Sequence, residues 1–252
     1  MVTLPRYDVH RLAKSLRAEV RGSVGDDPLT RALYAADASN YRAVPDLVIV
    51  PADREDLATA VALTAAAGAP VTLRGGGTSM AGNAIGGVVI DASRHVNRIL
   101  AIDREARTAI VEPGVVLTDL LAAALPLGLA FGADPSSASR ATLGGMIANN
   151  ACGAHSVAWG TTADNVRSLD VMLADGTRCT VDAAGNREKL GRKPGREGEL
   201  HRQLQSFVDR HELVIRRRFG QFTRQISGYA LHRLLPENSY DVAGLLCGSE
   251  GG

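Results

Sequence analysis

The sequence predicts an α+β fold built from two α/β subdomains with a ligand between them. One observation is a strand–helix–strand pattern, in which the apolar runs Leu47–Val50 and Val71–Leu73 flank an Ala- and Leu-rich segment. Strands joined in this way are parallel. The second observation is a later succession of short apolar stretches with tight links, including the hairpin signal Asp175-Gly176. A small parallel sheet followed by a larger, mostly antiparallel sheet with flanking helices is not a doubly wound sheet.

Elements in the first half follow from periodicity and caps. Apolar residues spaced for one face predict a helix over Asp8–Arg21. Asp53 is expected to begin the helix between the two parallel strands, and Gly68 to end it. Three further strands are predicted over Gly87–Asp91, Arg98–Ile102 and Ala106–Glu112.

Elements in the second half are less regular. An Ala- and Leu-rich run predicts a helix over Leu117–Leu125, and Val166–Ala183 reads as two strands around a tight turn. The segment Asn186–Glu199 mixes Gly, Pro and charge, which favours an exposed loop. A helix is predicted over His201–Arg218.

Composition excludes several classes of protein. The formal net charge of +1 gives no field for nucleic acid, and the triplet Arg216–Arg218 is interpreted as a solvated helix end. Cys152, Cys179 and Cys247 form no CxxC pair, which favours a reducing compartment. The histidines show no metal-ligand spacing, so no metal site is predicted. Neither a signal peptide nor an apolar run near the roughly 20 residues of a membrane span is present, and the cytoplasm is expected.

A glycine-dense loop follows the second parallel strand and leads into another strand. Arg74-Gly75-Gly76-Gly77-Thr78-Ser79 leaves consecutive backbone N–H groups unshielded, and such a row can bind a pyrophosphate. Arg74 can add charge, and the hydroxyls can donate further bonds. A Walker A loop would need a Lys before Ser or Thr, and a Rossmann fingerprint would need glycine where Met80 stands. Both fail, which leaves another phosphate site or a glycine-rich surface turn.

A second segment, Gly132–Gly160, has similar chemistry. It contains DPSS, TLGG and NNACG around a short apolar piece. Small residues let a backbone approach a large flat ligand closely, while hydroxyls and amides bind its edge. Two such segments favour a ligand site over a surface turn.

The order RGGGTSxxGN, VEPGV, DPxS, TLGG, NNACG and GTTADNV resembles the PCMH-type FAD-binding domain of the vanillyl-alcohol oxidase superfamily. Within it, the chain is similar to the FAD-linked D-lactate, glycolate and D-2-hydroxyglutarate dehydrogenases, above all those fused to an iron–sulfur domain. The resemblance covers roughly Asn40 to the C-terminus. It implies hydride transfer from a D-2-hydroxy acid to flavin N5, with the flavin supplying the redox chemistry.

The resemblance also implies which residues bind FAD, with the first loop around the pyrophosphate and the second segment along the rest of the flavin. The residues so implied are Arg74, Gly75, Gly76, Gly77, Thr78, Ser79, Gly82, Asn83, Pro135, Ser136, Thr142, Gly144, Gly145, Asn149, Asn150 and Gly153. Some members bind FAD covalently through a histidine in the first loop. No histidine lies between Val71 and Asp91, so noncovalent FAD is expected.

His155 and Cys152 are the only strongly reactive side chains in the second segment. His155 is a candidate for a place near the flavin ring, with a loop histidine bonded to backbone as the alternative. Cys152 is interpreted as a packing residue. Arg224 and Tyr229 are the candidates for the substrate side, with a structural role as the alternative. No catalytic residue is assigned.

The implied organisation is an N-terminal helix and connection at residues 1–45, an FAD subdomain at 46–103 with the pyrophosphate loop at 74–83, and a second subdomain at 104–252. In the family, the final GSEG turn continues into a strand, and a substrate-binding cap then follows, with a C-terminal segment that carries the acid–base histidine and, in several members, a divalent-metal site. The resemblance therefore implies a truncated, catalytically incomplete chain, with any iron–sulfur cluster in a C-terminal part beyond it.

The implied partners are FAD, a small 2-hydroxy acid and an electron acceptor, through which the protein could contact a membrane peripherally. The alternatives are a sugar or sugar-acid oxidase, an enolpyruvyl-sugar reductase, or a noncatalytic nucleotide-binding module.

Overall fold

The computed structural model describes residues 7–220, 222, 225 and 228–250, which form two compact units. Unit 1 comprises the described residues of Met1–Phe131 together with Ser136–Gly145 and Ala174–Gly176. Unit 2 comprises Gly132–Pro135, Met146–Leu173 and the described residues from Thr177 onward. These units are groups of closely packed residues, and the predicted subdomain boundary at residue 103 stays a prediction.

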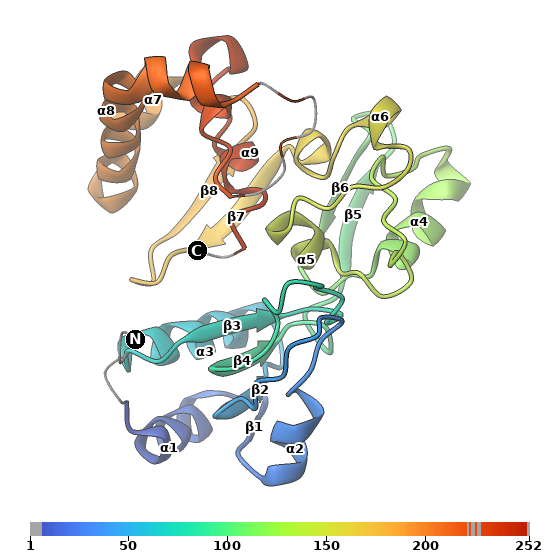
Figure 1. The fold of residues 1–252 in the computed structure, drawn as a ribbon, viewed down its shortest axis with the longest axis vertical. Helices are drawn as coiled ribbons and strands as arrows, with labels where there is room; N and C mark the ends of the chain where they lie inside the picture. Colours follow the sequence, from blue (N-terminus) through green and yellow to red (C-terminus); the bar gives the residue numbers. More distant parts are fainter. Residues whose placement is uncertain (1–6, 221, 223–224, 226–227, 251–252) are drawn as a thin grey trace. The chain divides into compact units, whose positions relative to one another are not determined.

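Unit 1 contains a four-stranded sheet (Figure 1). Its strands, in spatial order, are β1 (Ser23–Gly25), β2 (Leu47–Val50), β4 (Val88–Asp91) and β3 (Val71–Arg74). β1 is antiparallel to β2, whereas β2, β4 and β3 are parallel. The predicted parallel pair β2 and β3 is confirmed, and β4 lies between them. All four residues of β4 are buried, as a central parallel strand requires.

Two helices of unit 1 begin at an aspartate that caps them. Asp8 accepts from the N–H of Arg11 at the start of α1 (Val9–Glu19), and Asp53 accepts from the N–H groups of Glu55 and Asp56 at the start of α3 (Arg54–Ala66). Both helices share one core cluster with β2 and β4, including Leu12, Leu16, Leu47, Ile49, Ala60, Val88 and Ile90.

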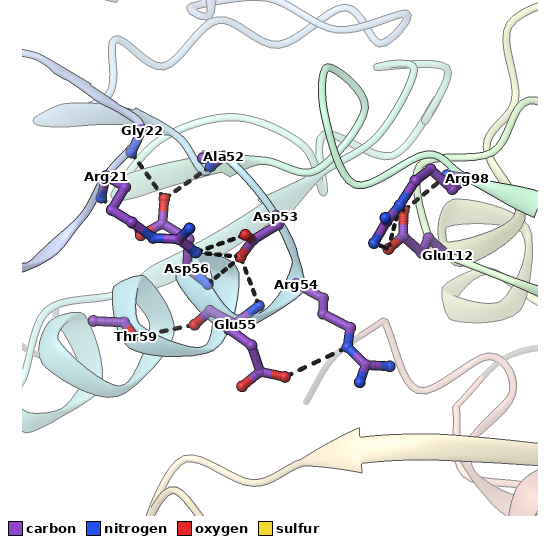
Figure 2. A network of polar contacts seen from close by, with 10 residues as sticks. All are labelled: Arg21, Gly22, Ala52, Asp53, Arg54, Glu55, Asp56, Thr59, Arg98 and Glu112. Atoms are coloured by element: carbon purple, nitrogen blue, oxygen red, sulfur yellow. Dashed lines mark hydrogen bonds and ion pairs between the residues drawn. The ribbon is translucent and has the colours of Figure 1, made fainter. Parts of the chain in front are cut away.

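Two buried carboxylates connect the ends of elements in unit 1 (Figure 2). Asp56, 2% exposed, accepts from the backbone N–H groups of Arg21, Gly22 and Ala52 at 2.8–2.9 Å. Glu112, 3% exposed, accepts from the backbone N–H and the guanidinium of Arg98. Buried carboxylates are stable only when they are hydrogen-bonded in this way.

The rest of unit 1 consists of shorter elements. The helix α2 (Pro28–Leu33) lies between β1 and β2 in the chain, and the hairpin of β5 (Ile99–Asp103) and β6 (Thr108–Val111) follows the last strand of the sheet. Then come α4 (Leu117–Ala124) and the 3₁₀ helix η1 (Leu125–Leu127).

Unit 2 contains the hairpin of β7 (Ser168–Met172) and β8 (Arg178–Asp182), in which Leu169 pairs with Val181. Gly176 in its turn has φ +82°, the left-handed conformation expected for this hairpin signal. The core of unit 2 includes Val181, Val208, Ile215, Leu234 and Leu235. The helices are α6 (Ser156–Trp159), α7 (Arg187–Gly191), α8 (Gly195–Arg218), α9 (Val242–Leu246), and the 3₁₀ helices η2 (Ala163–Asn165), η3 (Leu231–Leu234) and η4 (Pro236–Asn238). A further helix, α5 (Leu143–Ala148), has residues in both units.

One prediction for this part of the chain is wrong: Asn186–Glu199 is not a loop. Asn186 caps α7 by accepting from the N–H of Lys189, and Pro194 stands at the N-cap position of α8. Proline and glycine are tolerated at a helix start, where backbone N–H groups have no partner within the helix. α7 and α8 lie side by side (Figure 1).

The mixed α+β class is confirmed, with a four-stranded sheet that is parallel except for β1 and with two separate antiparallel hairpins. The sequence predicts one larger, mostly antiparallel sheet after the parallel one. Among the described residues, the strands of this part form two separate hairpins, β5–β6 and β7–β8. Among the described residues, no helix combines the length and apolarity needed to cross a membrane.

Candidate functional site

The glycine-dense loop connects β3 to β4 in unit 1. β3 ends at Arg74, and the chain returns to the sheet at Val88. Gly77 (φ +64°) and Gly82 (φ +82°) adopt left-handed conformations that favour glycine. In the part of the chain that the structure describes, none of the N–H groups of Gly75–Ser79 donates a hydrogen bond to another protein group. A row of N–H groups is thus available to an acceptor.

The loop packs against part of the second predicted segment. A Cβ at Gly75 would lie 2.0 Å from Thr142 Oγ1, and a Cβ at Gly76 would lie 2.0 Å from the carbonyl oxygen of Arg140. Gly76 is therefore required by a close approach of two backbones, and Gly75 by the side chain of Thr142 packed against it. The start of α5 is equally close-packed, since a Cβ at Gly144 would lie 2.7 Å from Pro113 Cβ. Unit 1 thus brings together two of the sequence-predicted segments.

Arg74 contacts protein carbonyls. Its Nη1 donates to the carbonyl oxygen of Ala84 at 2.9 Å, and its Nη2 donates to that of Ala36 at 3.0 Å. Its guanidinium carbon lies 5.2 Å from the centroid of the Tyr34 ring, a cation–π distance. The guanidinium that was predicted to contact a phosphate thus donates hydrogen bonds to its own loop and to the segment before β2.

Polar side chains stabilise the outer part of the loop. Ser79 Oγ donates to Asn83 Oδ1 at 3.0 Å and accepts from the N–H of Ala81. Asp37 accepts from the N–H of Ser39 and, at 3.4 Å, from that of Ala84. Burial alone would raise the pKa of Asp37, but these hydrogen bonds and the charge of Arg74 hold it below its usual value.

Residues 34–41 were not predicted as part of the site. The N–H of Ala38 donates to the carbonyl oxygen of Gly77 at 3.0 Å, and a Cβ at Gly82 would lie 3.0 Å from the ring of Tyr41. This segment reads as a turn-rich connection, and nothing in its sequence signals a contact with the loop.

Ser136 and Gly145 also belong to unit 1, and the remaining predicted residues, Pro135, Asn149, Asn150 and Gly153, belong to unit 2. A Cβ at Gly153 would lie 2.1 Å from the carbonyl oxygen of Asp134, so the DPSS and NNACG motifs are in contact. Asn150 is 3% exposed, has φ +44°, and accepts from the N–H of Ala163 through Oδ1. Its carboxamide oxygen therefore has a structural partner. Asn149 is exposed, and Pro135 is half-buried.

His155 is oriented by Asp134. Nδ1 of the ring and the backbone N–H of His155 both bond the Asp134 carboxylate, and the ring stacks on Trp159 with centroids 4.8 Å apart. The hydrogen bonds from His155 hold the pKa of Asp134 below its usual value, so the ionised carboxylate accepts and Nδ1 donates. Nε2 is left for another partner. Tyr229 is 43% exposed, whereas Arg224 lies outside the described residues.

Residues 45–182, which include both predicted segments, match the FAD binding domain family. The chain belongs to this family. It is 36% identical over 242 residues to a D-2-hydroxyglutarate dehydrogenase of Pseudomonas putida, covering 92% of this chain and 24% of that protein. It is 36% identical over 155 residues to the glycolate oxidase subunit GlcD of Bacillus subtilis, covering 60% of this chain and 33% of that one. A solved structure of alkyldihydroxyacetonephosphate synthase superposes with a TM-score of 0.61 at 25% identity, covering 72% of this chain and 39% of that one.

The resemblance to FAD-linked hydroxy-acid dehydrogenases is confirmed at the level of the family. The chain spans about a quarter of the length of the D-2-hydroxyglutarate dehydrogenases that it matches over most of its own length. Within the described residues, no group of three or more His, Cys, Asp or Glu side chains could hold a metal ion.

Proposed function

We propose that the chain binds FAD noncovalently, with the pyrophosphate against the backbone N–H groups of Gly75–Ser79. The observation that carries this proposal is the unpaired row of N–H groups in a loop within the matched family range. Such a row suits the anionic oxygens of a pyrophosphate and excludes no part of it by bulk, since three of its residues are glycines.

The other predicted residues complete the proposed FAD contacts. In unit 1 they include Gly82, Asn83, Ser136, Thr142 and the start of α5, and in unit 2 they include Pro135 and the NNACG motif. Bound FAD would supply the acceptor for a hydride, while these residues bind and orient it. The absence of a histidine between Val71 and Asp91 supports noncovalent attachment.

For the whole protein we propose oxidation of a D-2-hydroxy acid. The similar proteins named D-2-hydroxyglutarate dehydrogenase, glycolate oxidase subunit GlcD and D-lactate dehydrogenase support this class of substrate. In this proposal the electron acceptor is a separate partner, and any iron–sulfur cluster lies outside this chain. The predicted subdomains, 46–103 and 104–252, are retained as the organisation around the flavin.

The purified chain should bind FAD without a covalent bond to it. The purified chain, reconstituted with FAD if necessary, is expected to show flavin absorbance, and acid precipitation should release the flavin into the supernatant. Flavin in the precipitate would contradict noncovalent binding. A colourless chain that cannot be reconstituted with FAD would contradict FAD binding and would favour a noncatalytic nucleotide-binding module.

A panel of D-2-hydroxy acids and sugar acids, tested on the whole protein with an artificial electron acceptor, separates the substrate classes.

A further inference from the structure

The segment Tyr34–Tyr41 lies before the matched family range, yet it packs against the pyrophosphate loop. It is closed on itself by the bridge between Ala36 and Arg42 and by the hydrogen bond from Ala43 N–H to Ala35 carbonyl oxygen at 3.0 Å. We call residues 34–43 the support segment. Because its own backbone is closed, it offers a fixed surface to the loop.

Arg74 joins the support segment to the far end of the loop. One guanidinium nitrogen donates to Ala36 in the segment, and the other donates to Ala84 in the loop. A Cβ at Gly77 would lie 2.6 Å from Nη2 of Arg74, so the near side of the loop also lies against this side chain. A planar guanidinium holds two carbonyls in a defined geometry, which a lysine cannot reproduce.

The ring of Tyr34 packs against the guanidinium of Arg74. The ring centroid lies 5.2 Å from the guanidinium carbon, and the tyrosine hydroxyl donates to Asp91 Oδ2 at 2.7 Å. Asp91 is 4% exposed, and its Oδ1 accepts from the N–H and the hydroxyl of Ser93. Since Asp91 ends the buried strand β4, the ring is anchored to the sheet.

We propose that Tyr34, Asp91 and the support segment are positioning elements for FAD, which act through Arg74 to hold Gly75–Ser79 in the conformation that presents its N–H groups. This inference rests on the proposed function. It differs from the expectation that Arg74 adds charge to the phosphate, because its guanidinium already donates hydrogen bonds to two carbonyl oxygens of the protein. If only a fraction of loops are in the binding conformation, the apparent Kd rises by the inverse of that fraction.

The test compares Tyr34→Leu with Tyr7→Phe in the full chain. Tyr7 is the matched control, since its hydroxyl donates to Asp46 at 2.6 Å as that of Tyr34 does to Asp91, without contacting Arg74. Tyr34→Leu removes the ring and should raise the Kd for FAD, measured by flavin fluorescence, about tenfold. Tyr34→Phe keeps the ring and should raise it about threefold. Tyr7→Phe should leave it unchanged.

A second readout separates positioning from general destabilisation. The N–H of Ala38 donates to Gly77 in the loop, so its hydrogen exchange in the absence of FAD reports the contact between the segment and the loop. In Tyr34→Leu this exchange should be faster, while the thermal midpoint stays near that of Tyr7→Phe. A purely structural role would lower the midpoint and leave the Kd at low temperature unchanged.

Arg74→Gln, alone and combined with Tyr34→Leu, decides how Arg74 acts. If both residues act through one loop conformation, the double variant should bind FAD about as weakly as the weaker single variant. Effects that multiply would instead indicate that Arg74 contacts the phosphate directly, and they would overturn the proposal. So would a Tyr34→Leu chain with wild-type affinity. A wild-type chain without affinity for FAD would overturn the proposed function itself, and the exchange of Ala38 would still report whether the support segment holds the loop.

Discussion

Individual glycines in the pyrophosphate loop have different reasons for being glycine. Gly77 adopts a left-handed φ, whereas Gly75 and Gly76 lie against Thr142 and Arg140, with no room for a Cβ. A sequence motif does not separate these reasons, because each glycine appears equally able to approach a phosphate. In this structure the backbone of Arg140 excludes a side chain at Gly76, and the side chain of Thr142 excludes one at Gly75.

Gly76→Ala is expected to impair FAD binding through this contact. The new Cβ would meet a backbone carbonyl at 2.0 Å, which cannot move as a flexible side chain can, so the loop must shift. We expect a loss of affinity of about tenfold or more, about 1.4 kcal/mol, measured by flavin fluorescence.

Gly191→Ala is the matched control for this prediction. Its Cβ would meet only the end of the Gln205 side chain, at 3.1 Å, and alanine favours the helix α7 in which it lies. Affinity should be unchanged in this variant. Wild-type affinity in Gly76→Ala as well would show that the contact with Arg140 does not set the loop conformation.

At the scale of elements, the sequence predicts those that local chemistry defines. β2 has the predicted bounds, and Asp53 caps α3 as expected, because a buried apolar run and a capping carboxylate are local signals. The loop predicted at Asn186–Glu199 is wrong because Gly and Pro at a helix start look like loop residues. The support segment could not be predicted either, since its partners, Gly77 and Ala84, are distant in sequence.

The stability of the fold around the β5–β6 hairpin should depend on pH through Glu112. Burial alone would raise the pKa of Glu112, but hydrogen bonds from the guanidinium and N–H of Arg98, together with its charge, hold it below the ordinary 4.5. A carboxyl whose folded pKa is lowered stabilises the fold above its unfolded pKa and loses that contribution as the pH falls through its folded pKa.

Glu112→Gln should therefore lower the free energy of unfolding by about 2 kcal/mol at pH 7. The difference from wild type should shrink as the pH falls from 4.5 through the lower folded pKa, because the wild-type carboxyl becomes protonated first in the unfolded state and then in the folded state. Urea unfolding at pH 7, 5 and 3.5 measures this difference. If the two free energies of unfolding differ by the same amount at all three pH values, the charge of the carboxylate does not stabilise the fold.

At the scale of the whole molecule, the predicted FAD residues fall into two groups. Arg74–Ser79, Gly82, Asn83, Ser136, Thr142, Gly144 and Gly145 belong to unit 1, whereas Pro135, Asn149, Asn150 and Gly153 belong to unit 2. The motif order in the sequence gives no such division. It also does not reveal that Asn150 is buried with its carboxamide oxygen bonded, because that depends on where Ala163 lies.

If both groups bind FAD, the cofactor should stabilise both units. At a free concentration about 100 times its Kd, a ligand that binds only the folded state stabilises it by about 2.7 kcal/mol. The N–H of Ala92, bonded to Arg74, reports on unit 1, and that of Thr162, bonded to Ala151, reports on unit 2. FAD should slow the hydrogen exchange of both, whereas ADP, which carries the pyrophosphate without the flavin, should slow mainly that of Ala92. Protection by FAD confined to Ala92 would remove the residues of unit 2 from the site, and the pyrophosphate loop would then account for the binding by itself.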